Sequence, residues 1–269
     1  MQNKTSINRM VISRDGIGTT ASVIQRNNLL LHTFMTDYPA MILVRRGKKT
    51  IKIGTMEIVL SSGDAVALAA GTTCDLLNET DNGQFESTWI VFSDSIIDKV
   101  QQNFPKHKKL KDVIALKNLG SEFIQTFDRG IQAISASIPD SIAEIRIQEV
   151  LTWLAQMDIV FSLNTTENLQ REVRLKIGAA PDKEWISKSL ADSFAMSEAT
   201  FRRKLAEQGQ SFNQILIDVR MTTALTLLQV TDISISQIAY QVGYESSSRF
   251  SVRFKKRFGF SPIAVRKAP

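Results

Sequence analysis

Cationic side chains alternate with regularly spaced phenylalanines near the C-terminal end of the sequence. Phe250, Phe254 and Phe258 recur at every fourth position. The positions between them, which we expect to be exposed, hold Arg249, Arg253, Lys255, Lys256 and Arg257. Such groups on one helix face can bind phosphate oxygens, and an arginine can also donate two hydrogen bonds to a guanine edge. The spacing therefore favours nucleic-acid recognition.

The elements that position these side chains are two short helices and a tight turn. Ile235, Ile238, Ala239 and Val242 form the apolar stripe of a first amphipathic helix, and Gly243 follows where a helix commonly ends. Serines at 246–248 offer N-capping side chains for the basic second helix. The pattern predicts a helix-turn-helix, although a basic helix face can also be merely solvated.

A related unit precedes it in residues 182–205. Phe201 and Leu205 are spaced to face inward, while Arg202, Arg203 and Lys204 are expected to be exposed. An apolar pattern over residues 212–229 predicts one long helix between the two units. Arg220 lies among its buried positions, so we expect it to have a partner.

The charge distribution agrees with a nucleic-acid-binding part at this end of the chain. Residues 1–165 hold 17 Lys and Arg against 17 Asp and Glu, and residues 166–269 hold 16 against 10. The whole net charge of +6 thus resides after residue 165. Phosphate backbones attract a basic surface through counterion release. We expect two domains, 1–165 and 166–269.

Residues 20–92 have the texture of β structure. Short apolar runs, such as residues 40–44 and 65–69, alternate with turns rich in Gly, Asp and Asn. They predict a small antiparallel barrel or sandwich, and residues 45–76 resemble the pattern of a cupin-like barrel. Helices are expected over 96–104, 119–135 and 141–161. The last has a broad apolar face, and the pair formed by the last two helices either packs on the barrel or supplies a dimer interface.

The residue inventory does not favour a metal, a cofactor or an enzyme. The chain has two histidines, His32 and His107, which form no ligand cluster with the single Cys74 at a recognisable spacing. No catalytic triad or phosphate-binding glycine loop is found. We therefore expect no cofactor and no catalytic or metal site. The sequence has no run apolar enough for a membrane helix and begins without a signal peptide, so we expect a cytoplasmic protein.

At this point the C-terminal pattern resembles the DNA-binding domain of the AraC/XylS family of bacterial transcription regulators. The matching residues are Leu190, Ala191, Ser197, Phe201, Arg202, Arg203, Gly209, Ser211, Phe212, Arg220, Ala224, Leu227, Leu228, Ile235, Ile238, Ala239, Val242, Gly243, Tyr244, Ser246, Phe250, Phe254, Lys255, Phe258, Gly259, Ser261, Pro262 and Arg266. The resemblance implies an α+β chain: a small N-terminal cupin-like β-barrel with a helical segment, followed by an all-α domain with two helix-turn-helix units joined by a long helix.

The resemblance also implies which side chains meet DNA. In this family the second helix of each unit enters the major groove, the two grooves being about one turn apart. The implied base-reading residues are Ala199, Arg202, Arg203, Ser247, Ser248 and Arg249. The implied phosphate contacts are Lys204, Arg253, Lys255 and Lys256. Arg202 and Arg203 are the best candidates for reading sequence, and the second unit for gripping the backbone.

These patterns predict a sequence-specific regulator, an activator that binds double-stranded DNA and contacts RNA polymerase. Three roles stay open for the N-terminal domain: binding a small-molecule effector, meeting a regulatory protein, or forming a homodimer. Two alternatives also stay open, namely a cupin-type enzyme with a basic DNA-binding appendage and a nonspecific architectural DNA binder.

Overall fold

The computed structural model describes residues 10–162 and 169–266 of the chain. The described residues divide into two compact domains, an N-terminal domain of residues 10–162 with 229–232 and a C-terminal domain of residues 169–228 with 233–266. The predicted domain boundary at residue 165 lies outside the described residues. No helix in the described parts is both long and apolar enough to cross a membrane.

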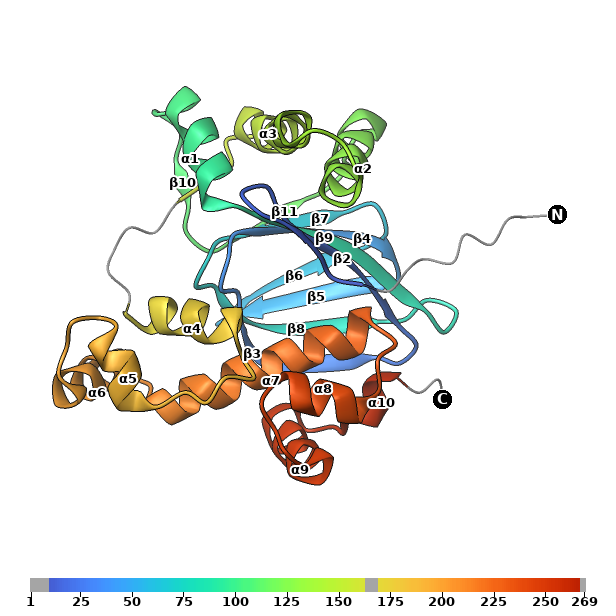
Figure 1. Cartoon of the computed structure of the whole chain (residues 1–269). Coiled ribbons are helices and arrows are strands. Elements are labelled where there is room, and N and C mark those ends of the chain that lie inside the picture. The colour runs from blue at the N-terminus through green and yellow to red at the C-terminus, as the bar shows by residue number, and fades with distance from the viewer. Residues whose placement is uncertain (1–9, 163–168, 267–269) are drawn as a thin grey trace. The chain divides into compact units, whose positions relative to one another are not determined.

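The N-terminal domain contains two antiparallel sheets (Figure 1). The six-stranded sheet has the order β1-β2-β9-β4-β7-β11, with β1 Ile12–Arg14, β2 Gly18–Gln25, β9 Phe85–Phe92, β4 Ala40–Arg46, β7 Ala65–Leu68 and β11 Val113–Leu116. The four-stranded sheet has the order β3-β8-β5-β6, with β3 Leu29–Met35, β8 Thr73–Glu79, β5 Lys48–Ile53 and β6 Met56–Leu60. A two-residue loop that includes Gly54, at φ 58°, joins β5 to β6.

The predicted order of a β domain followed by an all-α domain is confirmed, and the β domain is an open sandwich. Among the described residues no strand ladder joins the two sheets. The edge strands β1 and β11 have only 3 and 4 residues, and short edges limit further pairing. The sheets meet through side chains instead: Asn78 of β8 donates to Gln25 of β2 at 2.6 Å, and the Lys49 ammonium lies 5.2 Å from the Phe85 ring centre.

Three helices, α1 (Asp94–Asn103), α2 (Ser121–Ser135) and α3 (Asp140–Gln156), lie over the six-stranded sheet (Figure 1). Their apolar faces share one core with residues of that sheet, including Met41 and Phe92. Arg14 of β1 fixes the α2–α3 corner, because its Nη1 donates to the carbonyl of Ala133 at 2.8 Å and its Nε donates to Asp140 at 2.8 Å.

Helix α3 is shorter than predicted and has apolar side chains on two faces. It ends at Gln156 because the chain reverses at Asp158, with φ 60°, and then forms the short strand β12 (Val160–Phe161) beside β10 (Lys109–Leu110). Ile147 and Leu154 are fully buried. Ile145, by contrast, is 58% exposed, so the apolar residues of this helix do not form one buried face.

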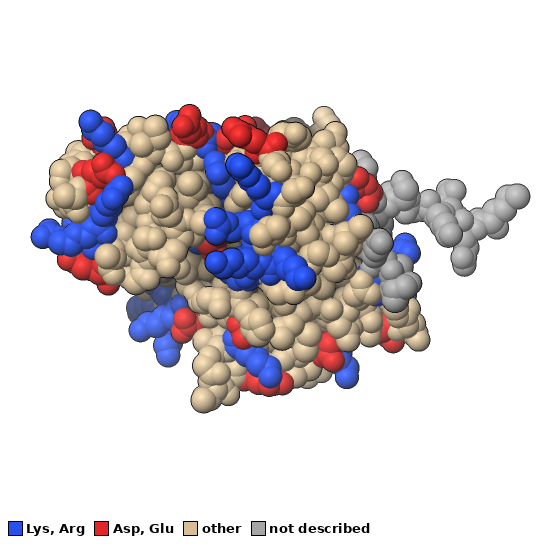
Figure 2. All heavy atoms as spheres, turned by 90° about the horizontal axis from the view of Figure 1, so that it is seen from below, with Lys and Arg blue, Asp and Glu red and all other residues tan. Residues whose placement is uncertain are grey.

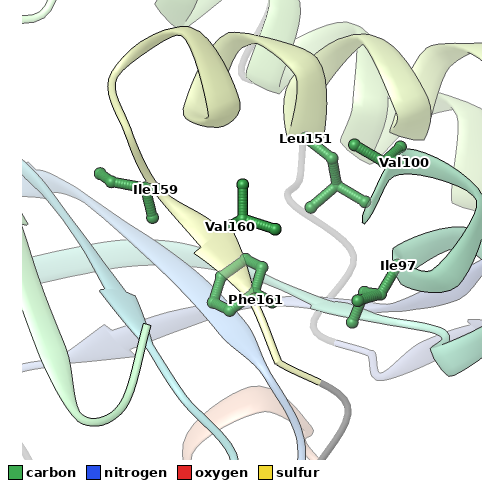
Figure 3. A pocket seen from close by; sticks show the side chains of 6 residues that line it. All are labelled: Ile97, Val100, Leu151, Ile159, Val160 and Phe161. Carbon is green, nitrogen blue, oxygen red and sulfur yellow. The ribbon is translucent and has the colours of Figure 1, made fainter. Parts of the chain in front are cut away.

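A small apolar cavity lies between α1, α3 and β12 (Figure 3). It is lined by Ile97, Val100, Leu151, Ile159, Val160 and Phe161. Its volume of about 10 Å³ is room for roughly one water molecule. This cavity therefore does not accommodate a small-molecule effector in the conformation described.

The C-terminal domain is helical. It contains α4 Leu169–Ala179, α5 Ser187–Asp192, α6 Glu198–Glu207, α7 Phe212–Val230, α8 Ile235–Gln241, α9 Ser247–Phe258 and α10 Pro262–Arg266. One apolar cluster joins α4, α5, α6 and the first half of α7, and it includes the fully buried Phe201. After it, Phe250, Phe254 and Phe258 of α9 bury their rings against one another. The long helix α7 runs between these two parts.

Candidate nucleic-acid interface

The two helix-turn-helix units have the same turn. In the first, Met196 N–H donates to the carbonyl of Ala191 at 3.1 Å, and in the second Tyr244 N–H donates to the carbonyl of Ala239 at 2.9 Å. Both turns pass through the left-handed region one residue earlier, at Ala195 with φ 53° and at Gly243 with φ 78°. This is the hydrogen-bond pattern that ends a helix and redirects the chain. The sequence correspondence of the two units therefore has a backbone basis.

Helix α6 presents the predicted cationic face of the first unit. Ser197 caps it by accepting a hydrogen bond from Thr200 N–H at 3.2 Å. Phe201 and Leu205 are fully buried, which turns Ala199, Arg202, Arg203 and Lys204 to the exposed side. Glu198 and Glu207 engage two of these cations.

The two arginines of α6 carry intrahelical ion pairs. Arg202 lies 2.6 Å from Glu198, with 66% of its side chain exposed, and Arg203 lies 3.7 Å from Glu207, with 71% exposed. Exposed pairs of this kind contribute about 0.2–1 kcal/mol. Both guanidinium groups can therefore exchange their carboxylate for a base or a phosphate at little cost.

Helix α9 presents the second cationic face. Ser246 caps it, and Ser248, Arg249, Arg253, Lys255 and Lys256 are exposed. Ser247 is half-buried, because it precedes the buried Phe254 by two helical turns and lies on the same side. Its base-reading role stays a prediction with a less favourable position than that of Ser248 or Arg249.

The expectation that Arg257 is exposed was wrong. Only 18% of its side chain is exposed, its Nε donates to Asp218 of α7 at 2.6 Å, and its guanidinium lies 4.9 Å from the Phe258 ring centre. Arg257 follows Phe254 by three residues, so it lies beside the buried stripe rather than opposite it. It is a structural residue of the second unit.

Arg220 has the partners that its place in α7 requires. Its Nε donates to the carbonyl of Pro181 at 2.9 Å and its Nη2 donates to that of Lys183 at 3.0 Å. Its guanidinium also lies 5.9 Å from the Tyr244 ring centre. Burial lowers the pKa of Arg220 and raises that of Tyr244. The first helix of this unit, α5, begins at Ser187 and not at the predicted start of the unit at residue 182, and the carbonyls of Pro181 and Lys183 turn to Arg220 instead.

A carboxylate two residues before Arg220 has partners that the sequence patterns did not reveal. Asp218 accepts one hydrogen bond on each oxygen, from Arg174 of α4 at 2.7 Å and from Arg257 of α9 at 2.6 Å. Arg174 is 1% exposed. Asp218 lies 44 positions after Arg174 and 39 positions before Arg257 in the sequence. No local pattern connects positions so distant.

Figure 2 shows Lys and Arg side chains gathered on the face seen from below. The ten predicted DNA-contacting residues lie on the two second helices of the helix-turn-helix units, and only Ser247 among them is turned toward a core. The described residues contain no group of three or more His, Cys, Asp or Glu side chains that could hold a metal ion. Cys74 is buried, and burial raises its pKa to about 11.

Comparisons with known proteins agree with this geometry. A helix-turn-helix domain model matches residues 190–268, and a model described as the ExsA N-terminal regulatory domain matches residues 39–160. The regulator YdeO of Escherichia coli K12 is 36% identical over 109 residues, which are 40% of this chain and 43% of YdeO. The transcriptional activator AggR of Escherichia coli is 40% identical over 91 residues, 34% of each chain. The matches thus span less than half the length of these relatives.

The fold of the chain also matches solved structures. The structure of ToxT from Vibrio cholerae aligns with a TM-score of 0.66 and 13% identity over 93% of this chain and 100% of that one. At this identity the match concerns the fold alone. The two helix-turn-helix units, the domain model over residues 190–268 and the identity to YdeO and AggR show that this part of the chain is a DNA-binding domain of the AraC/XylS family of bacterial transcriptional regulators.

Proposed function

We propose that this protein is a sequence-specific DNA-binding regulator of transcription in the bacterial cytoplasm, and not an enzyme. The observation that carries the proposal is the pair of helices α6 and α9, each preceded by the same turn and each with cations opposite a buried apolar face. In the proposal Ala199, Arg202, Arg203, Ser247, Ser248 and Arg249 face base edges. Lys204, Arg253, Lys255 and Lys256 contact phosphates.

The test is selection of binding sites from a random DNA library by the purified full-length chain. The proposal expects enrichment of a site with two short sequence elements whose centres lie about 10–10.5 base pairs apart on one face of the duplex. Competition against random duplex then separates the alternatives. Equal affinity for selected and random DNA would favour a nonspecific architectural binder instead.

Activation is the regulatory direction that the relatives support. The urease operon transcriptional activator, AggR and CfaD, all of Escherichia coli, carry the word activator in their names, and these names describe those proteins. We propose that this chain likewise contacts RNA polymerase beside its site. Transcription in vitro from a promoter with the selected site upstream should rise when the protein is added, and a fall in transcript would indicate a repressor.

For the N-terminal domain we propose a regulatory role that includes a homodimer formed through α3. Ile142, Ile145, Trp153 and Met157 leave apolar surface exposed on this helix. A shallow depression of about 420 Å³ runs along it, lined by Ile145, Gln148, Glu149, Thr152, Trp153 and Gln156. Apolar residues thus lie on both sides of Glu149, so an antiparallel pairing of two copies would bring Ile145 of one against Trp153 of the other.

Light scattering of the full chain tests this interface. Ile145→Glu should convert the dimer to a monomer, because it places a charge in an apolar contact. Gln125→Glu, at an exposed position of α2, adds the same charge and should leave the dimer intact. A wild-type chain that remains monomeric at micromolar concentration would contradict the dimer. It would leave a ligand or a regulatory protein as the signal that the N-terminal domain receives.

A further inference from the structure

The carboxylate of Asp218 joins elements from both helix-turn-helix units. Its Oδ2 accepts from Arg174, which belongs to α4 and packs with the first unit. Its Oδ1 accepts from Arg257, near the C-terminal end of the reading helix α9. Each oxygen has its own arginine, and charge-assisted hydrogen bonds of this kind are short and directional.

The site lies at the place on α7 where the two packed parts meet. Val219, the next residue, is buried in the cluster that contains Phe201 of α6. Arg220, the residue after that, binds the α4–α5 loop and lies against Tyr244 in the second turn. Asp218 and Arg220, two polar residues of α7 on either side of Val219, therefore tie the first helix-turn-helix unit to the second.

Such ties matter for a protein that reads two grooves. Adding one base pair between two DNA elements increases their separation by about 3.4 Å and rotates one element relative to the other by about 34–36°. A rigid pair of reading helices cannot follow this change, whereas a loosely joined pair can. The spacing that the protein accepts is therefore a property of the joint between the units.

We propose that Asp218 is a positioning residue for DNA recognition. By holding Arg174 and Arg257 together it fixes α9 relative to α6, and so sets the spacing between the two DNA elements that the chain accepts. The inference rests on the proposed function. It assigns a role in specificity to three residues that touch no base in the proposed complex.

The experiment measures binding of the full chain to the selected site and to probes with one base pair inserted or removed between its elements. Wild type should bind the altered probes about tenfold more weakly or worse, since they lose the contacts of one reading helix. Arg257→Gln releases α9 and leaves the buried Arg174–Asp218 pair intact. In this variant the ratio between correct and altered spacing should fall below about threefold.

Two further variants separate positioning from affinity and from folding. Lys256→Gln removes a cation from the same helix, so it should weaken binding to all probes alike and keep the wild-type ratio. Asp218→Asn should lower the ratio as Arg257→Gln does, and circular dichroism monitors its folding. A folded Arg257→Gln protein with the wild-type ratio overturns the inference and leaves the proposed function standing. A wild type that selects no site overturns the proposed function, and the inference with it.

Discussion

The guanidinium of Arg220 lies directly against the backbone of Gly243. A Cβ atom added at residue 243 would lie 2.5 Å from the Arg220 Nη2 and 2.9 Å from the carbonyl oxygen of Pro181. Gly243 also has φ 78°, a conformation that costs other residues about 1–2 kcal/mol. Glycine is therefore required at this turn for two reasons, conformation and space.

The corresponding turn of the first unit allows a matched comparison. Gly243→Ala should lower the stability of the second unit by about 2–4 kcal/mol through strain and overpacking. Ala195→Gly should raise stability by about 0.5–1 kcal/mol, because Ala195 already has φ 53° and glycine removes that strain. Calorimetric unfolding of the full-length variants measures both. Equal and small effects at the two turns would show that the contact with Arg220 is unimportant.

Arg202 should act on sequence preference. With Arg202→Ala the protein should lose discrimination at one base step, worth about 1–3 kcal/mol for a bidentate contact, and retain most of its affinity for random DNA. Binding to a panel of single-base variants of the selected site measures this. Uniform weakening on every sequence would instead make Arg202 a phosphate contact.

Lys256 should act on affinity alone. Lys256→Ala should weaken binding to all sequences and lower the slope of log K against log salt by about one, because one phosphate contact is lost. Titrations at several salt concentrations with selected and random duplex give the slope. An unchanged slope would remove Lys256 from the interface.

The buried Lys49 should make the N-terminal domain more stable as pH rises. Burial lowers its pKa from 10.5 to about 8, although its ammonium donates to Asn78. Between these values the unfolded chain binds a proton that the folded chain does not, so stability increases with pH in this window. The burial that raises the pKa of Cys74 from 9.0 to about 11 has the opposite effect above pH 9.

The Lys49 contribution is therefore isolated between pH 8 and pH 9. Over this interval the unfolding free energy of wild type should gain about 1 kcal/mol relative to Lys49→Met. Urea unfolding of both proteins at the two pH values provides the difference. A constant difference would mean that Lys49 has an ordinary pKa.

The elements of the DNA-binding unit could be predicted because their patterns are local. The spacing of Phe250, Phe254 and Phe258 predicts a helix and its buried face, and Gly243 predicts the turn before that helix. Strand β8 has a weaker signal, because Asp75 and Asn78 interrupt its apolar residues. Which apolar residues of α3 are buried and which, like Ile145, stay exposed could not be predicted, because apolar character alone does not distinguish the two faces of this helix.

The link through Asp218 could not be predicted for a different reason. Nothing in the sequence near Asp218 marks it, and its partners come from helices far away along the chain. A charged residue in an amphipathic helix is ordinarily solvent-exposed. Only the packing of α4 and α9 against α7 makes this carboxylate the partner of two arginines.

The most direct test of the account is the binding-site selection with the wild-type chain, followed by footprinting on the enriched site. The account predicts two protected major-groove segments about one helical turn apart on one face of the duplex, with sequence preference strongest in the segment contacted by α6. Enrichment of no sequence, or a single protected segment that Arg202→Ala leaves unchanged, would contradict it.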